Sequence, residues 1–187
     1  MSNKLNTQGI AISAILCSIA IIIPMFSPIK IVLEPASFTL ASHVPIFLAM
    51  FISPQTAIFV TIGSTIGFLF GGFPLPIVLR ALSHLLFVVI GSLYIKKNSN
   101  IIYEKKKSLA YSFVMSVVHA IGEVMIIMPF YFGSSLSQGY YDKGFMISVI
   151  GLVGIGTIIH SMVDFSLAKY IWNLVPKNVV QKNIIKA

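Results

Sequence analysis

Residues 108–132 read SLAYSFVMSVVHAIGEVMIIMPFYF, and His119 and Glu123 are the only histidine, acidic or basic residues among them. An α-helix needs about 20 predominantly apolar residues to cross the hydrocarbon core of a bilayer. The stretch therefore predicts a membrane-spanning helix. Ionisable side chains inside a membrane are costly and usually face a cavity or a partner. His119 and Glu123 are thus the first candidate functional residues.

Apolar runs of similar length recur along the whole chain. The 187-residue sequence is 57% hydrophobic and 10% charged, whereas a soluble domain carries about 25% charged residues. Breaks, most of them rich in proline and glycine, separate six predicted helices, at about residues 7–25, 35–52, 55–70, 77–94, 108–132 and 144–174. We therefore expect an all-α membrane protein with six transmembrane helices in a single domain, residues 1–187. The first run lacks a cleavage pattern, so we expect it to be retained.

The lysines predict the orientation of the chain. If six helices start inside the cell, ten lysines lie inside, and only Lys30 and Lys143 lie outside. The inside lysines are Lys4, Lys96, Lys97, Lys105, Lys106, Lys107, Lys169, Lys177, Lys182 and Lys186. Lysine-rich segments stay in the cytoplasm, so both termini are expected to be cytoplasmic. Their position beside the lipid bilayer also accounts for the net charge of +8 without a nucleic-acid partner.

Absent motifs narrow the function. Cys17 is the only cysteine, which excludes an intrachain disulfide and a cysteine-based metal site. The sequence has no Gly-Lys-Ser/Thr phosphate loop, so we expect neither an ATPase nor another enzyme, and no cofactor. An inverted repeat is not evident either, which argues against a self-contained secondary transporter.

Polar residues occur in pairs on the last three predicted helices. The pairs are Arg80 and His84, His119 and Glu123, and His160 and Asp164. Their spacing of four residues is about one helical turn, so the members of each pair share a face. If the three faces converge they line one polar pocket, to which His43 is the only comparable contribution from the first three helices. The Arg80 guanidinium can hold a carboxylate through two parallel hydrogen bonds.

Two other interpretations of these residues stay open. The pairs could be satisfied within the protein, in a purely structural or assembly subunit. The four histidines, with Glu123 and Asp164, are also plausible zinc, nickel or cobalt ligands, as in an intramembrane metalloenzyme or metal carrier. His-Glu-x-x-His is absent, and the charge of Arg80 would repel a cation, so no metal is expected.

Two patterns concern surfaces rather than the pocket. Gly9 and Ser13, and beside them Ala14 and Ser18, place small residues four apart on the first helix. Such a stripe suits close contact with another helix, either inside the protein or in a partner. Tyr131 and its aromatic neighbours fit an interfacial belt or a lid over a flat ligand.

Two segments carry a resemblance to a known family. Residues 27–45 read SPIKIVLEPASFTLASHVP, and residues 71–84 read GGFPLPIVLRALSH. With a small-residue first helix and polar groups in the last three helices, the chain resembles the substrate-binding S components of energy-coupling factor (ECF) vitamin transporters. The two segments resemble the niacin-specific NiaX branch most.

The resemblance implies a role in uptake across a bacterial cell membrane. The S component would capture the vitamin outside, dock through its first helix on the coupling protein EcfT, and topple when two ATPase subunits drive the complex. The docking motif Ala-x-x-x-Ala of the family corresponds to Ala14-x-x-x-Ser18, a departure that leaves the docking register open.

The same resemblance suggests roles for the polar residues. For nicotinate, Arg80 would clamp the carboxylate, and His84 or His119 would lie beside the pyridine ring. Glu123, His160 and Asp164 would orient these groups, and Glu34 and Phe38 would contribute to a gate. Tryptophan or a queuosine precursor are alternative substrates.

Overall fold

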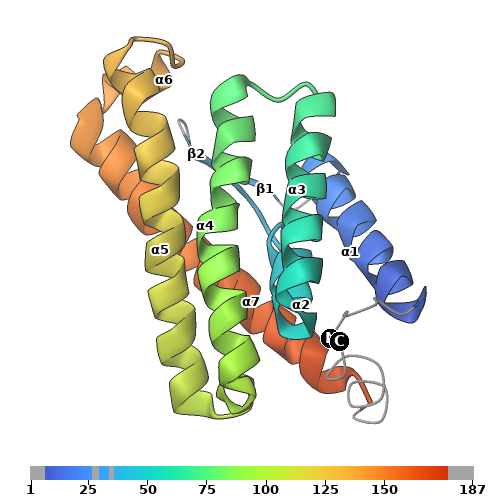
Figure 1. Ribbon diagram of the computed structural model, residues 1–187. Helices are drawn as coiled ribbons and strands as arrows, with labels where there is room; N and C mark the ends of the chain where they lie inside the picture. The colour runs from blue at the N-terminus through green and yellow to red at the C-terminus, as the bar shows by residue number, and fades with distance from the viewer. Residues whose placement is uncertain (1–6, 27–29, 34–35, 177–187) are drawn as a thin grey trace.

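The computed structural model describes residues 7–26, 30–33 and 36–176 and shows a helical bundle with one short β-hairpin (Figure 1). The elements in chain order are α1 (Thr7–Phe26), β1 (Lys30–Leu33), β2 (Ala36–Thr39), α2 (Val44–Ile52), α3 (Pro54–Phe70), α4 (Leu75–Lys97), a 3₁₀ turn (Ser99–Ile102), α5 (Lys105–Phe132), α6 (Gly139–Asp142), a π-helical stretch (Met146–Ile155) and α7 (Gly156–Leu174). Helices α4 and α5 lie side by side, α7 crosses behind them, and α1 lies beside α3.

Four of the described helical segments are long and apolar enough to cross a membrane. They are Gly9–Phe26, Leu75–Lys97, Lys105–Phe132 and Met146–Leu174. Helix α3 is also apolar but has only 17 residues. The prediction of a helical membrane protein is confirmed, and the number of six spans stays a prediction.

The second predicted helix is wrong over its first half. Residues 36–39 form β2, which pairs antiparallel with β1, and α2 begins only at Val44 and has nine residues. Ile31 and Val32 in β1, and Phe38 and Thr39 in β2, are residue types that favour strands. Ala41 adopts a left-handed φ of 66°, which ends any continuous helix. The predicted helix start at Pro35 lies outside the described residues.

An aromatic core holds the helices together next to the polar residues. The ring centroid of Phe47 in α2 lies 5.6 Å from that of Phe87 in α4 and 5.3 Å from that of Phe165 in α7. All three side chains are buried. The ring of His119 in α5 lies against Phe87, with centroids 4.5 Å apart. Large buried rings contribute much packing energy, so this core fixes the elements that carry the polar pairs.

Helix α1 packs closely on α3 because glycine residues of α3 leave room for side chains of α1. A Cβ atom added at Gly67 would lie 2.7 Å from the Ile21 side chain. Nearer the start of α1, Ser13 Oγ donates a hydrogen bond of 3.3 Å to Thr56 Oγ1 of α3. Part of the small-residue stripe of α1 is therefore used inside the protein.

The Gly67→Ala substitution should loosen this contact. Ile21 is branched at Cβ and cannot swing away, so α1 has to shift, and overpacking of this kind costs about 1–3 kcal/mol. Thermal unfolding of the purified protein in detergent measures the loss. Gly154→Ala is the control, because its Cβ would meet nothing closer than 3.5 Å. Equal stability of the two variants would contradict this account of the α1–α3 contact.

Candidate functional site

The polar pairs of α4, α5 and α7 converge, and the Glu123 carboxylate lies at their centre. Arg80 Nη2 donates to Glu123 Oε2 at 2.7 Å, and Thr157 Oγ1 of α7 donates to the same oxygen at 2.6 Å. On the other side, His84 Nε2 lies 3.3 Å from Glu123 Oε1. Only 5% of the Glu123 side chain is exposed. One buried carboxylate thus connects three helices, and it offsets the charge of the only arginine in the sequence.

A second buried carboxylate, Asp164 of α7, holds the loop that follows the hairpin. Its Oδ1 accepts the backbone N–H of Ala41 at 2.9 Å, and its Oδ2 accepts the backbone N–H of His43 at 2.9 Å. The same Oδ2 lies 3.1 Å from His43 Nδ1. These bonds hold the unusual backbone of Ala41 in place and orient the His43 ring. The loop of residues 40–43 is therefore positioned by a residue more than 120 positions away along the chain.

The four histidines of the chain form one cluster with His43 in the middle. The His43 ring centroid lies 4.8 Å from those of His84 and His119 and 5.0 Å from that of His160, and all three contacts are edge-to-face. Ser42 Oγ connects the loop to α7, because it lies 3.1 Å from His160 Nε2. The imidazoles of α4, α5 and α7 thus surround the His43 ring of the loop.

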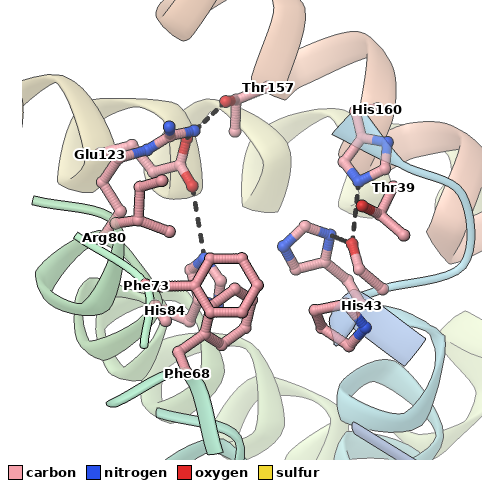
Figure 2. A pocket seen from close by; sticks show the side chains of 13 residues that line it. Thr39, His43, Phe68, Phe73, Arg80, His84, Glu123, Thr157 and His160 are labelled. Atoms are coloured by element: carbon pink, nitrogen blue, oxygen red, sulfur yellow. Dashed lines mark hydrogen bonds and ion pairs between the residues drawn. The ribbon is translucent and has the colours of Figure 1, made fainter. Parts of the chain in front are cut away.

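A cavity of about 80 Å³ lies beside this cluster (Figure 2). In the same measure a single water needs about 10–15 Å³, so the cavity suits a small molecule. Its lining residues are Pro24, Thr39, Ser42, His43, Phe68, Phe73, Ile77, Arg80, Ala81, His84, Glu123, Thr157 and His160. Figure 2 shows Phe68 and Phe73 between the Arg80–Glu123 pair and the His43–His160 side. The cavity therefore combines a charged wall, an imidazole wall and an aromatic wall.

Five of the predicted site residues line this cavity. They are Arg80, His84, Glu123, His160 and His43. His119 and Asp164 are buried behind them and touch the lining residues rather than the cavity. Tyr131 lies elsewhere, in an aromatic cluster with Tyr141 and Phe145. Glu34 lies outside the described residues, and of Phe38 only the backbone, in β2, is described.

The cavity also uses residues that the sequence reasoning did not single out. Thr157 precedes His160 by three residues, so helical spacing could have placed both on one face. Phe73 belongs to the turn 71–74, which was interpreted as a break between helices and as part of a segment that resembles NiaX, with no role given to Phe73 itself. Thr39 and Ser42 reach the cavity because of the hairpin, and the helix predicted there gave no reason to expect this. Tyr140 of α6 interacts with Arg80, and burial raises the pKa of its hydroxyl.

The small residues of the first helix differ in exposure. Ser13 is buried against α3, and Gly9 is partly buried and accepts a 2.7 Å hydrogen bond from Ser13 Oγ at its carbonyl. Ala14 and Ser18 are exposed on the opposite side. Two separate surfaces thus result, one internal and one available to a partner.

Fold and site together define a helical membrane protein with a small cavity, lined by charged, imidazole and aromatic side chains, inside its bundle. The chain is 35% identical, over 198 aligned positions, to the niacin transporter NiaX of Lactococcus lactis subsp. cremoris (strain MG1363). The match covers 100% of this chain and 87% of that protein. The chain therefore belongs to the NiaX family, and the resemblance to S components of ECF transporters is confirmed. Neither a protein-family model nor a solved structure matches the chain.

A double-mutant cycle tests the Arg80–Glu123 pair. Glu123→Gln or Arg80→Met alone should destabilise the protein by about 3–5 kcal/mol, because each leaves an uncompensated buried charge. The double variant should lose far less than the two single losses together. Unfolding in detergent gives the energies, and Thr157→Val, which removes one hydrogen bond to the charged carboxylate, should cost about 1.5–3 kcal/mol. Single losses that simply add would show that the pair is not coupled.

Proposed function

We propose that this protein is the niacin-binding S component of an ECF-type importer. The observation that carries the proposal is the identity of 35% with a niacin transporter along the whole chain. The cavity supports it, because its lining combines one guanidinium, imidazoles and two phenylalanine rings. Nicotinate is a flat aromatic ring with one carboxylate. The guanidinium matches the carboxylate, and the imidazoles and phenylalanine rings match the aromatic ring.

In the proposed complex the carboxylate of nicotinate binds to Arg80. Arg80 Nη2 donates a hydrogen bond to Glu123, while the buried Nε of Arg80 has no hydrogen-bond partner among the described residues. Glu123 therefore fixes the guanidinium plane and leaves donors for a ligand, an arrangement that favours a planar carboxylate. Phe68 and Phe73, with ring centroids 4.8 Å apart, would pack against the pyridine ring, and His84 would lie at its edge.

The small size of the cavity favours a single-ring substrate. Nicotinate has one six-membered ring and would need less rearrangement of a cavity of about 80 Å³ than tryptophan or a queuosine precursor, which carry fused rings. Thr39 and Ser42 of the hairpin and its following loop line the cavity. The hairpin would therefore act as the lid over the substrate, with Glu34 and Phe38 at the gate.

Transport would follow from docking on partner proteins. We propose that both termini are cytoplasmic, that the chain crosses the membrane six times as one domain, and that α1 docks on EcfT with two ATPase subunits attached. The exposed Ala14 and Ser18 form the proposed contact, because small residues allow helices to approach closely.

The Arg80→Lys variant tests the proposed binding mode. A single ammonium cannot reproduce the planar guanidinium, so nicotinate affinity should fall at least about tenfold, which is about 1.4 kcal/mol. Calorimetric titration of the purified protein measures this. Lys97→Arg, the reverse exchange at an exposed position of α4, should leave the affinity unchanged. Unchanged affinity in Arg80→Lys would remove Arg80 from the site.

The Ala14→Leu variant tests docking separately from binding. A larger side chain should block close approach of α1 to EcfT, so nicotinate uptake by cells should be lost. Nicotinate binding to the purified variant should persist, because Ala14 is exposed and far from the cavity lining. Val114→Leu, at an exposed position of α5, is the control with normal uptake. Normal uptake by Ala14→Leu would place the docking surface elsewhere.

A further inference from the structure

His43, His84 and His119 form a buried group that the proposed niacin site does not fully use. Each offers one ring nitrogen, and these three atoms all lie within 4.8 Å of one another. His119 in particular is 1% exposed and does not line the cavity. A fully buried imidazole at this position needs an explanation of its own.

The contacts of the three rings with carboxylates leave at least one nitrogen atom of each ring unused. His43 Nδ1 faces Asp164, which leaves its Nε2, and His84 Nε2 faces Glu123, which leaves its Nδ1. His119 Nε2 lies 3.5 Å from Glu123 Oε1. Within the described part of the chain, Nδ1 of His84 and both nitrogens of His119 have no hydrogen-bond partner although they are buried. Unpaired buried polar atoms are costly, so these nitrogens are suited to a ligand.

The carboxylates behind the rings match the surroundings of metal-binding histidines. A histidine that binds a metal through one nitrogen usually donates its other N–H to a carboxylate or carbonyl, which fixes the tautomer. Asp164 takes this position for His43, and Glu123 takes it for His84 and lies near His119. Both buried carboxylates are therefore arranged as partners of the imidazoles.

The buried charges also favour a cation. Among the described residues around the cluster, Arg80 contributes one positive charge, and Glu123 and Asp164 contribute two negative charges. Histidines bind a metal in their neutral form, and the second negative charge then has no cationic side chain as its partner among these described residues, which is expensive inside a membrane protein. The expected repulsion by Arg80 is weakened, because its guanidinium is bound to Glu123 at 2.7 Å. A divalent cation would make the site positive by one charge, and the nicotinate anion would then neutralise it.

We propose that His43, His84 and His119 bind a divalent transition metal of the zinc class, whose open coordination position takes the pyridine nitrogen of the substrate. The substrate part of this inference rests on the proposed function, and the metal part does not. Three imidazoles with an open fourth position are a common zinc arrangement, and nickel and cobalt accept the same ligands. The open position points into the cavity, because His43 and His84 line it and His119 lies behind them.

The rings have to close slightly to bind the metal. Zinc–nitrogen bonds of about 2.0–2.1 Å put tetrahedral ligand atoms about 3.3–3.4 Å apart. The three nitrogens lie within 4.8 Å of one another, so each pair of nitrogens has to approach by up to about 1.4 Å. Arg80 and the metal would then hold opposite ends of nicotinate, the first its carboxylate and the second its ring nitrogen.

The first experiment measures metal binding without any substrate. Purified protein in detergent is stripped with a chelator and titrated with Zn²⁺ and with Co²⁺. We expect one metal ion per chain, with the visible absorption of tetrahedral Co²⁺. His119→Gln should weaken metal binding at least about tenfold, whereas Ser116→Ala, a buried position one turn away on α5, should not. Stripped wild-type protein that takes up neither metal overturns the inference, as does equal uptake by His119→Gln.

The second experiment measures substrate affinity with and without Zn²⁺. Zinc should raise nicotinate affinity at least about tenfold, and by clearly more than it raises the affinity for benzoate, which has the carboxylate and no ring nitrogen. In His119→Gln the gain in nicotinate affinity on adding zinc should disappear. Equal nicotinate affinity in the stripped and loaded protein overturns the substrate part and leaves the proposed function standing. If nicotinate binds neither form, the proposed function fails, and the metal site is judged on metal uptake alone.

Discussion

The contact between the Glu123 carboxylate and Arg80 is the interaction on which the site depends. A lone guanidinium or carboxylate buried in a membrane protein would cost several kcal/mol. Arg80 Nη2 and Glu123 Oε2 lie 2.7 Å apart, so the attraction between the two groups offsets this cost. Because Thr157 and His84 bind the same carboxylate, the pair also sets the relative positions of α4, α5 and α7. The geometry of the cavity follows from one buried charge pair and the aromatic core packed beside it.

Asp164 has the corresponding role for the irregular part of the chain. It ties the loop after the hairpin to α7 through two backbone N–H groups and the His43 ring. A segment that contains strands and a left-handed residue would otherwise leave polar backbone groups unpaired in an apolar surrounding. In the proposed function the hairpin covers the cavity, while the loop at its end is fixed to the bundle by Asp164. This combination of a fixed base and a covering hairpin is what a protein that captures a small solute needs.

The sequence predicted the helical membrane protein and the shared face of each polar pair, because apolar length and four-residue spacing are local properties. Whether the three faces converge stayed open, because that depends on how the helices pack. The sequence did not predict the hairpin, because proline and apolar residues at 35–52 are compatible with a helix or with strands followed by a short helix. Nor could it separate residues at the cavity, such as Arg80, from residues behind it, such as His119. Sequence spacing indicates which face of a helix a residue occupies. Whether that residue reaches the cavity depends on which side chain of another element packs between the residue and the cavity. Thr39 and Ser42 were missed because the hairpin that brings them to the cavity was not predicted.

The most direct test of this account is an experimental structure of the protein saturated with nicotinate. The account predicts ligand density in the cavity between α4, α5 and α7, with the carboxylate against Arg80 and the ring against Phe68 and Phe73. Glu123 should still bind Arg80 from the opposite side. Nicotinate found outside this cavity, or a cavity that stays without ligand density at saturating concentration, would contradict it.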